Sequence, residues 1–360
     1  MAHIDDAFVA DWIALEMRSV EGNAYLSPHF IQPALKYLDP RKRVVLVGIF
    51  RNEGGCDRLI GVGPFVIRPP TARFPLPHLE AYRSPHTFLT GMLLDRDHHW
   101  LALAALGAYL SSGGVPWCGI EFEERFADSA LDEIHKDESI TFRISWNEYY
   151  RHRRAILVSA TAAESVSAVL AGGTLGKELR RKRRRLEERG EVGWRFRTGA
   201  EVTSECIDTF LHLEDQGWKG QTGKSMLSRE GHADFFRDMS QRFAGAGRAF
   251  FTELTLDGRV IASTSNFISG RIAFAFKIGW DIEFAAVSPG LLNELELMKY
   301  ADKYLPTVDF VDSGAAEGSF IDRLWRDRRD VATGILTGGY AGAAILPALS
   351  MARRLKRGSS

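Results

Sequence analysis

Three strand-like runs follow one another in residues 249–280, which read AFFTELTL-DG-RVIASTSNFIS-GR-IAFAFKIGW. Asp257-Gly258 stands between the first two runs and is a dipeptide that tight hairpin turns favour. Residues 249–256 and 260–268 therefore predict an antiparallel hairpin, and residues 272–280 predict a third strand.

A loop and a helix follow the third run. Val287-Ser288-Pro289-Gly290 opens a helix that runs to Tyr304, because Ser288 suits the N-cap and Pro289 the first helical turn. Residues 308–311 then predict a strand that ends at Asp312-Ser313-Gly314. Two predicted helices precede the hairpin, at 203–216 and 231–243.

The first half of the chain shows the same order of elements. We predict a helix at 7–19, a strand pair at 43–50 and 59–67, and a third strand at 79–82. A Pro-containing loop at 84–86, a second helix at 99–111 and a last strand at 117–122 follow. We infer an internal duplication of about 150 residues, a usual size for a domain. The fold class expected is α+β, with two tandem lobes, each a mixed, mostly antiparallel sheet flanked by helices.

Between the halves lies a basic helix at 175–189, in which Lys177 and all of residues 180–185 are Lys or Arg, and Leu179 and Leu186 lie on one face. It is either a solvated linker that packs its apolar stripe on a domain, or a surface that captures a phosphate-bearing ligand or nucleic acid. The expected domains are 1–160, 161–190 as the linker helix, 191–340, and 341–360 as a terminal helix with a basic tail.

Composition sets limits on partners and compartment. The 46 Lys and Arg residues balance the 46 Asp and Glu residues, so no global field attracts DNA or anionic lipid. Cys56, Cys118 and Cys206 are far apart and form no C-x-x-C pair, which argues against a zinc or redox motif. The acidic start resembles no signal peptide, so we expect a cytoplasmic protein, with membrane contact through residues 341–357 as the alternative.

Other familiar motifs fail their tests. Segments 171–178 and 218–225 imitate a phosphate-binding P-loop, but each lacks the first glycine. His98 and His99 are adjacent, so their side chains point in different directions and no shared metal is expected. Neither an H-E-x-x-H motif nor a G-x-S-x-G motif is present.

The loop at Ser288 is the most informative segment. If a helix starts there, the backbone N–H groups of Gly290, Leu291, Leu292 and Asn293 lie at the positive end of its dipole. Such an end binds anions and suits a pyrophosphate. The alternative is a plain helix start docked on the sheet.

The chain resembles one known family along its second half. The shared features are the basic helix, Phe210-Leu211-His212-Leu213, Gln216-Gly217-Trp218, the hairpin, Ser288-Pro289-Gly290-x-Leu292 and Arg323-Leu324-Trp325. This order is similar to the acetyltransferase-like domain of the cellulose-biosynthesis-associated (CelD-type) family, a branch of the GNAT superfamily. The resemblance covers residues 164–337 well and the first half only in outline. It implies GNAT-like lobes that are related also to the Fem-type peptidoglycan aminoacyl transferases.

The resemblance implies a site for acetyl-CoA or another acyl-CoA in the second lobe, without a metal. The third strand would hold the pantetheine, and Ser288, Gly290, Leu291, Leu292 and Asn293 would hold the pyrophosphate. Backbone near Ile278 and Gly279 would bind the acyl carbonyl. An acceptor amine must lose a proton, so Asp312 and Asp281 are candidate bases, each with a turn or cap residue as the alternative. Trp218, Lys219 and Lys277 are candidates for the acceptor pocket, with core or surface roles as the alternatives.

The sequence also departs from the superfamily. The usual [QR]-x-x-G-x-[GA] signature is replaced by Ser288-Pro289-Gly290, and no tyrosine lies between Asp312 and Gly339 to act as general acid. The function expected is acyl transfer to an amine or hydroxyl of a small-molecule or glycan acceptor, with sugar or envelope components as candidates. Two rivals remain: an aminoacyl-tRNA-dependent Fem-like transferase, and a non-catalytic scaffold in polysaccharide biosynthesis.

Overall fold

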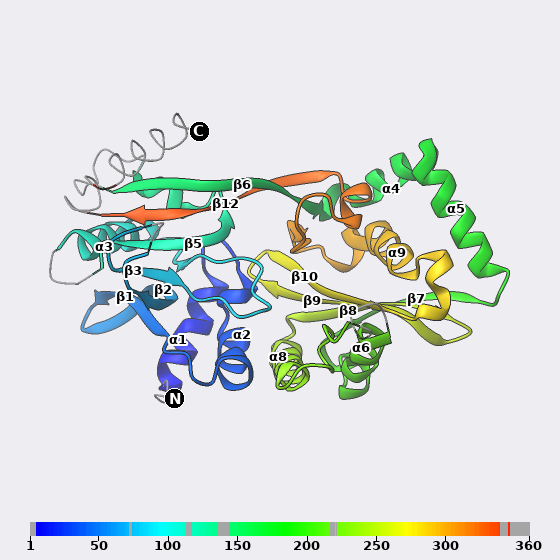
Figure 1. The fold of residues 1–360 in the computed structure, drawn as a ribbon, viewed down its shortest axis with the longest axis horizontal. Coiled ribbons are helices and arrows are strands. Elements are labelled where there is room, and N and C mark those ends of the chain that lie inside the picture. The colour runs from blue at the N-terminus through cyan, green and yellow to red at the C-terminus, as the bar shows by residue number, and fades with distance from the viewer. Residues whose placement is uncertain are drawn as a thin grey trace. The chain divides into compact units, whose positions relative to one another are not determined.

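The three runs at 249–280 form three neighbouring antiparallel strands, β8 (Ala249–Leu256), β9 (Arg259–Ser269) and β10 (Ile272–Trp280). Asp257 has φ 49° and Gly258 has φ 81°, which are the left-handed values that a type I′ turn requires. The structure is a computed structural model (Figure 1). It describes residues 5–71, 74–112, 117–135, 144–216, 220, 222–338 and 345.

The chain divides into two compact units. Unit 1 comprises residues 1–28, 41–153 and 330–360, and unit 2 comprises residues 29–40 and 154–329. These limits differ from the domain boundaries that the sequence suggests, because two long strands contribute to both units. In unit 2, β6 (Ser145–Val158) pairs through its last residues with β11 (Phe310–Asp312). In unit 1, β12 (Asp327–Thr337) pairs with β5 (Gly119–Phe126).

The sheet of unit 2 has the order β6-β11-β10-β9-β8-β7, with β7 (Val192–Thr198) at its edge. Neighbours are antiparallel except β10 and β11, which run parallel. A parallel pair needs a crossover connection, and the helix α9 (Pro289–Tyr304) provides it. The sheet is therefore mixed and mostly antiparallel, as expected.

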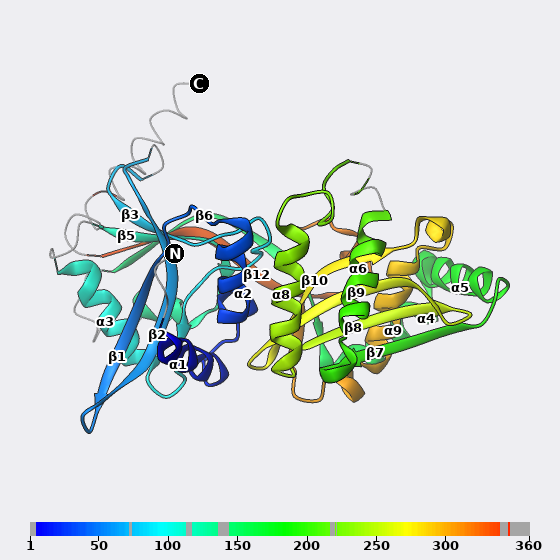
Figure 2. The ribbon, with the colours of Figure 1, turned by 90° about the horizontal axis from the view of Figure 1, so that it is seen from below.

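Helices cover both faces of this sheet. Figure 1 shows α4 (Ala162–Ala171), α5 (Gly173–Glu187) and α9 on one side of β7–β10. In the view from below, α6 (Ser204–Gln216) and α8 (His232–Gly245) lie across the other face (Figure 2). Residues 29–40, which include most of α2 (Pro28–Pro33), also belong to this unit.

Unit 1 repeats the topology of unit 2. Its sheet has the order β1-β2-β3-β5-β12-β6, and the short β4 also pairs with β2. The elements of this unit not yet given are α1 (Asp6–Met17), β1 (Val45–Glu53), β2 (Cys56–Arg68), β3 (His78–Ala81), β4 (Leu93–Leu94) and α3 (His99–Ser111). β3 and β5 are parallel, as β10 and β11 are in unit 2. The expected α+β fold with two lobes is confirmed.

Short helical segments complete both units. They are η1 (Ala24–Leu26), η2 (Ala34–Leu38), η3 (Ala130–His135), η4 (Ser159–Thr161), η5 (Gly199–Glu201), η6 (Ile282–Val287) and η7 (Phe320–Arg323). The sequence patterns missed β6 and β7. β6 reads SWNEYYRHRRAILV, and its charged residues obscure the alternation that identifies a strand. Its burial comes from neighbouring strands, which a local pattern does not contain.

The basic helix α5 is an integral part of unit 2. Leu179 and Leu186 are fully buried in the same apolar core as residues of α4 and α9. A Cβ on Gly176 would lie 2.4 Å from the carbonyl oxygen of Val169, so α4 and α5 touch backbone to backbone. The apolar stripe of the helix therefore packs on unit 2, as the first of the two expectations has it.

The C-terminal helix expected at 341–355 and the basic tail lie outside the described residues, apart from Ile345. Among the residues that are described, no helix is long and apolar enough to cross a bilayer. Within the same part of the chain, no three His, Cys, Asp or Glu side chains are grouped so that they could hold a metal ion.

The burial of α5 yields a stability prediction. Leu179→Ala should lower the free energy of unfolding by about 2–5 kcal/mol, because it leaves a cavity in the core of unit 2. The matched control is Arg181→Ala on the exposed face of the same helix, which should change it by no more than about 0.5 kcal/mol. Urea unfolding of both variants measures the difference. Equal effects would contradict the packing of α5.

Candidate functional site

The strands β10 and β11 separate after a short stretch of pairing. Ile272, Ala273 and Phe274 pair with Phe310, Val311 and Asp312, and the described residues include no further pair between these strands. On its other side, β10 stays paired with β9 up to Trp280. The edge of residues 275–280 that faces β11 therefore has backbone groups available for a ligand.

A bulge in β10 sets which side chains face which helix. The register with β9 shifts between Ala275 and Lys277, so Phe276 is an extra residue. Phe276 stacks on Phe236 of α8, with ring centroids 6.0 Å apart. After the bulge, Ile278 and Gly279 lie on opposite faces of the strand. Ile278 contacts α9, and Gly279 contacts α6.

Gly279 allows α6 to approach the strand. A Cβ at this position would lie 2.6 Å from the backbone nitrogen of Glu214. Lys277 is half-buried on the α8 side. Burial lowers the pKa of His232, and the positive charges of Arg229 and Lys277 lower it further. The structure thus gives Gly279 a packing role and brings Lys277 close to α8. Trp218 and Lys219, the other predicted acceptor residues, lie outside the described residues.

The N-terminus of α9 offers fewer free N–H groups than the sequence suggests. Ser288 has φ 50° and ψ 63°, and its carbonyl oxygen accepts from the N–H groups of Leu291 and Leu292 at 3.0 and 3.2 Å. Asn293 stands in the second turn, where backbone N–H groups bond within the helix. Pro289 has no N–H. Of the four N–H groups that the sequence places at the positive end of this helix, Gly290 therefore supplies the one without an acceptor among the described residues.

A lysine from α5 adds the positive charge that the missing N–H groups would have supplied. The Nζ atom of Lys182 donates to the Ser288 hydroxyl at 2.8 Å and to the Glu178 carboxylate at 2.7 Å. Sequence reasoning did not single out Lys182, because it is one of seven basic residues in the helix. An ammonium group, a hydroxyl and a helix N-terminus together favour an anion such as a phosphate.

Gly290 lets this loop lie directly on β10. A Cβ at position 290 would meet the Cδ1 atom of Ile278 at 2.9 Å. The start of α9 therefore lies beside residues 275–280, the part of β10 whose edge toward β11 is unpaired.

The side chains of Asn293 and Glu294 are buried between α9 and the sheet. Asn293 Nδ2 donates to the hydroxyls of Thr252 and Thr264 at 2.9 and 3.1 Å. Trp194 Nε1 donates to Asn293 Oδ1 at 3.0 Å. The Thr264 hydroxyl donates to Glu294 Oε1 at 2.6 Å. Asn293 thus anchors the helix through its side chain.

Glu294 is a carboxyl group that the sequence analysis missed. It is fully buried, and its Oε2 atom has no hydrogen-bond partner among the described residues. Burial raises the pKa of Glu294 from 4.5 to about 7, and the Thr264 hydrogen bond opposes this shift. The available signal was a glutamate placed among the apolar residues of segment 291–298.

Asp312 lies where β10 and β11 separate. It is fully buried, and its Oδ1 atom accepts from the Gly314 N–H at 2.7 Å and lies 3.5 Å from Arg154. Its Oδ2 atom has no partner among the residues that the structure describes. Burial raises the pKa of Asp312 above its usual value, although Arg154 opposes the shift. These are properties of a carboxyl group suited to proton transfer.

Asp281 has the geometry of a cap. Its Oδ1 atom accepts from the Glu283 N–H at 2.9 Å, which caps η6, and its Oδ2 atom pairs with Arg259. Both oxygens are therefore engaged. Of the two candidate bases, Asp312 alone has an oxygen available.

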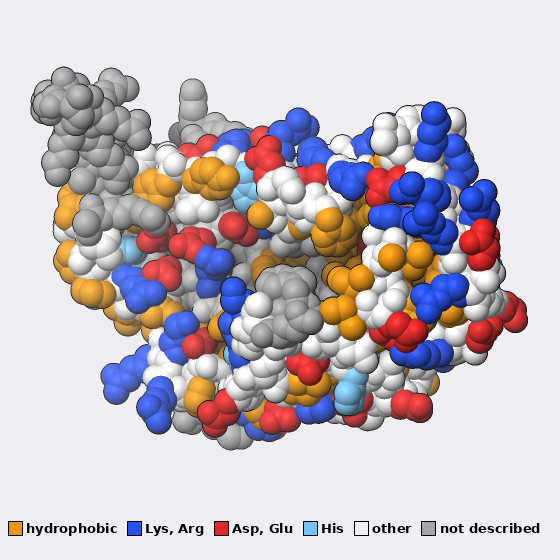
Figure 3. Space-filling view, turned by 45° about the vertical axis from the view of Figure 1, so that its right-hand side comes forward, with side chains coloured by type: hydrophobic (Ala, Val, Ile, Leu, Met, Phe, Trp, Pro, Cys, Tyr) orange, Lys and Arg blue, Asp and Glu red, His pale blue; other side chains and the backbone are white. Residues whose placement is uncertain are grey.

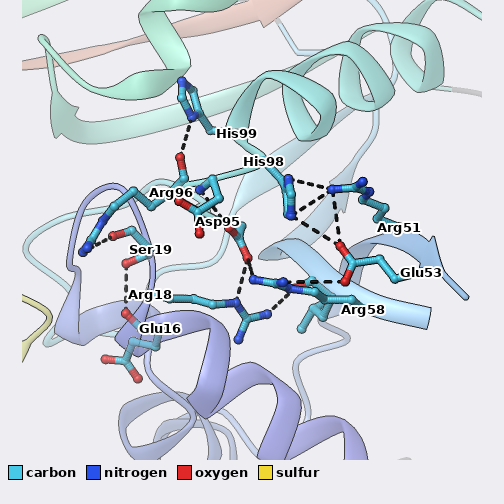
Figure 4. A network of polar contacts seen from close by, with 12 residues as sticks. Glu16, Arg18, Ser19, Arg51, Glu53, Arg58, Asp95, Arg96, His98 and His99 are labelled. Atoms are coloured by element: carbon cyan, nitrogen blue, oxygen red, sulfur yellow. Dashed lines mark hydrogen bonds and ion pairs between the residues drawn. The ribbon is translucent and has the colours of Figure 1, made fainter. Parts of the chain in front are cut away.

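The loop before α3 is the counterpart in unit 1 of the Ser288 loop, and its own side chains occupy it (Figure 4). Asp95 is buried there and accepts from Arg18 at 2.7 Å and from Arg58 at 3.0 Å. It also accepts from the Asp97 N–H at 2.9 Å. A carboxylate of unit 1 therefore already accepts a backbone N–H just before α3, whereas at the start of α9 the Gly290 N–H has no acceptor among the described residues.

Residues 175–317 match the acetyltransferase (GNAT) domain family. That range includes Lys182, the Ser288 loop and Asp312, so the GNAT match contains the whole candidate site. No curated protein matches the sequence of this chain.

Solved structures share the fold over nearly the whole chain. FemX has a TM-score of 0.55 at 12% identity, with 93% of this chain and 96% of FemX covered. A conserved protein of unknown function from Bacteroides thetaiotaomicron has a TM-score of 0.52 at 13% identity, covering 92% and 98%. The C-terminal domain of a protein named as a lysylphosphatidylglycerol synthetase, from Agrobacterium fabrum, has a TM-score of 0.52 at 11% identity, covering 95% of each chain. At these identities the likeness concerns the fold alone.

The burial of Glu294 predicts a pH dependence of stability. Because the pKa is higher in the folded state, the folded state holds the proton more tightly, and stability falls as pH rises from about 4.5 to about 7. The loss should be about 3 kcal/mol, at about 1.4 kcal/mol per pKa unit. Urea unfolding of wild type and Glu294→Gln across this range measures it.

Glu294→Gln should remove this part of the slope, since glutamine does not ionise. Thr264→Val is the companion variant. It removes the hydrogen bond that favours the ionised form, so the loss of stability should extend to higher pH. A slope in Glu294→Gln equal to that of the wild type would contradict the assignment.

Proposed function

We propose that this protein is an acyl-CoA-dependent acyltransferase whose donor site lies in unit 2. The observation that carries the proposal is the Ser288 loop with Lys182 beside it, inside the range that matches the GNAT family. The acceptor is an amine or a hydroxyl of a small molecule or glycan. The resemblance of Ser288-Pro289-Gly290 and the basic helix to the cellulose-biosynthesis-associated branch favours a sugar or envelope component.

The donor would run from the loop along β10. Its phosphate would meet the Gly290 N–H, the Ser288 hydroxyl and the ammonium group of Lys182. Its pantetheine amides would bond to the free edge of residues 275–280, as the peptide groups of an added strand would. The thioester would then lie near the point where β10 and β11 separate, beside Asp312.

In the transfer step, the acceptor nitrogen or oxygen attacks the thioester carbonyl carbon. A C–N or C–O bond forms, the carbonyl oxygen becomes an oxyanion, and the C–S bond then breaks to release the thiolate. Backbone N–H groups of the free β10 edge would stabilise the oxyanion. Asp312 Oδ2 would accept the proton that the acceptor loses, and that proton neutralises the leaving thiolate directly or through solvent.

A second candidate is a Fem-like transferase whose donor is an aminoacyl-tRNA. The observation in its favour is the fold shared with FemX over most of both chains, together with the exposed cations of α5. It would bind charged tRNA with a steep dependence on salt and would show no affinity for CoA.

Two substitutions test the donor site. Gly290→Val should abolish acetyl-CoA binding, because the new side chain collides with Ile278 and displaces the loop. Lys182→Gln should weaken binding about tenfold or more, since a hydrogen bond to a charged group contributes about 1.5–3 kcal/mol. Isothermal titration with acetyl-CoA measures both effects.

Each donor-site variant has a matched control. Gly245→Val makes the same change at the end of α8, where a Cβ meets nothing within 4 Å. Arg183→Gln removes the neighbouring cation, which pairs with Glu296 at 2.8 Å. Both controls should bind acetyl-CoA like the wild type. Retained binding by Gly290→Val would overturn the site assignment.

The two candidate bases are separated by their amide variants. Asp312→Asn should lower kcat about 10²–10⁴-fold, the usual contribution of a general base, and remove the acidic limb of the pH–rate profile. Asp281→Asn should leave kcat unchanged and lower the melting temperature, because Asp281 caps η6. Thiol release from acetyl-CoA with a panel of amino sugars is the assay. A normal pH–rate profile in Asp312→Asn would exclude it as the base.

A further inference from the structure

The basic helix α5 has an inner and an outer set of cations. On the inner side, Lys182 contacts Ser288, and Arg183 pairs with Glu296 and Glu187. The outer row consists of Lys177, Arg181 and Arg185, all exposed. These three have neither a hydrogen bond nor an ion pair with the residues that the structure describes. Figure 3 shows Lys and Arg side chains gathered over this helix.

The outer row repeats every four residues, which is the spacing of one helix face. Successive members lie about 6 Å apart along the axis, and the row is about 12 Å long. A second helix with Asp or Glu at every fourth position has the same repeat, so its carboxylates would match the cations one to one. The spacing therefore favours an acidic helix as the partner.

Other polyanions fit the row less well. Nucleic-acid surfaces that bind single strands combine cations with aromatic platforms, and α5 has no aromatic residue. Helices that lie on membranes insert apolar side chains, but Leu179 and Leu186 are buried in the core instead. The row therefore has charge without the apolar contacts of a membrane surface or the aromatic contacts of a single-stranded nucleic-acid surface.

The same helix connects this row to the donor loop. Lys182 follows Arg181 directly and contacts Ser288, where the donor phosphate is placed under the proposed function. The donors at that loop are one N–H, one hydroxyl and one ammonium group, a set sized for a single phosphate. A phosphopantetheine arm attached to a protein carries one phosphate, whereas CoA carries three.

We propose, resting on the proposed function, that α5 docks an acidic helix of a carrier protein that delivers the acyl group on a phosphopantetheine arm. The outer row binds the carboxylates of that helix. The arm enters beside Lys182 and Ser288, and its thioester follows the same path along β10 as that of acyl-CoA. The transfer chemistry is unchanged, because both donors react through the same thioester.

The test compares two triple variants that each remove three positive charges from the same helix region. The first replaces Lys177, Arg181 and Arg185 with Gln. The control replaces Arg180, Arg184 and Arg189 with Gln, whose guanidinium groups already contact Leu170, Glu188 and Glu283. The probes are acetylated acyl carrier protein, the same carrier without its arm, acetyl-CoA and total tRNA.

The first variant should bind the acetylated carrier about tenfold more weakly than the wild type, as expected for three exposed ion pairs. The control variant should bind it within about threefold of the wild type. Acetyl-CoA should bind equally to all three proteins, and the armless carrier should compete with the acetylated one.

Three outcomes would overturn the carrier proposal while leaving the proposed function intact. They are no affinity of the wild type for the carrier, an equal loss of acetyl-CoA and carrier affinity in the first variant, and tighter binding of tRNA than of carrier at the outer row. If the wild type binds neither acetyl-CoA nor the acetylated carrier, the proposed function itself fails.

Discussion

The side chain of Asn293 fixes the position on which the candidate site depends. It bonds to Thr252 on β8 and to Thr264 on β9, and it accepts a hydrogen bond from Trp194 on β7. A buried amide bonded to three strands holds one helix in one place, because any shift would leave polar groups without partners. Gly290, one turn earlier, is thereby set against Ile278, and Ser288 is brought to Lys182.

This anchoring network continues into Glu294. Thr264 accepts from Asn293 and donates to Glu294, so three side chains form one buried chain of hydrogen bonds. Burying the Glu294 carboxyl group costs solvation free energy, and its raised pKa reflects that cost. Fixing α9 and carrying a buried acid are therefore properties of the same few residues.

The two units use one topology with different chemistry at corresponding loops. In unit 2 the helix after the third strand begins at Ser288-Pro289-Gly290, and a lysine lies beside it. In unit 1 the corresponding helix follows Asp95, which two arginines neutralise. The repeated topology thus provides two scaffolds whose corresponding loops carry different side chains, and the proposed anion site rests on those of unit 2.

The sequence by itself determined the hairpin with its third strand, the start of α9 at Pro289, and the α+β order repeated in both halves. These are local features, since turn residues, caps and apolar spacing act within a few residues of each other. Only the tertiary structure decided that β6 and β12 contribute to both units, that Lys182 reaches Ser288, and that Asp281 is a cap while Asp312 has a buried free oxygen. Most of these facts depend on contacts between segments more than a hundred residues apart, and on the loss of water around particular atoms, neither of which a local pattern contains.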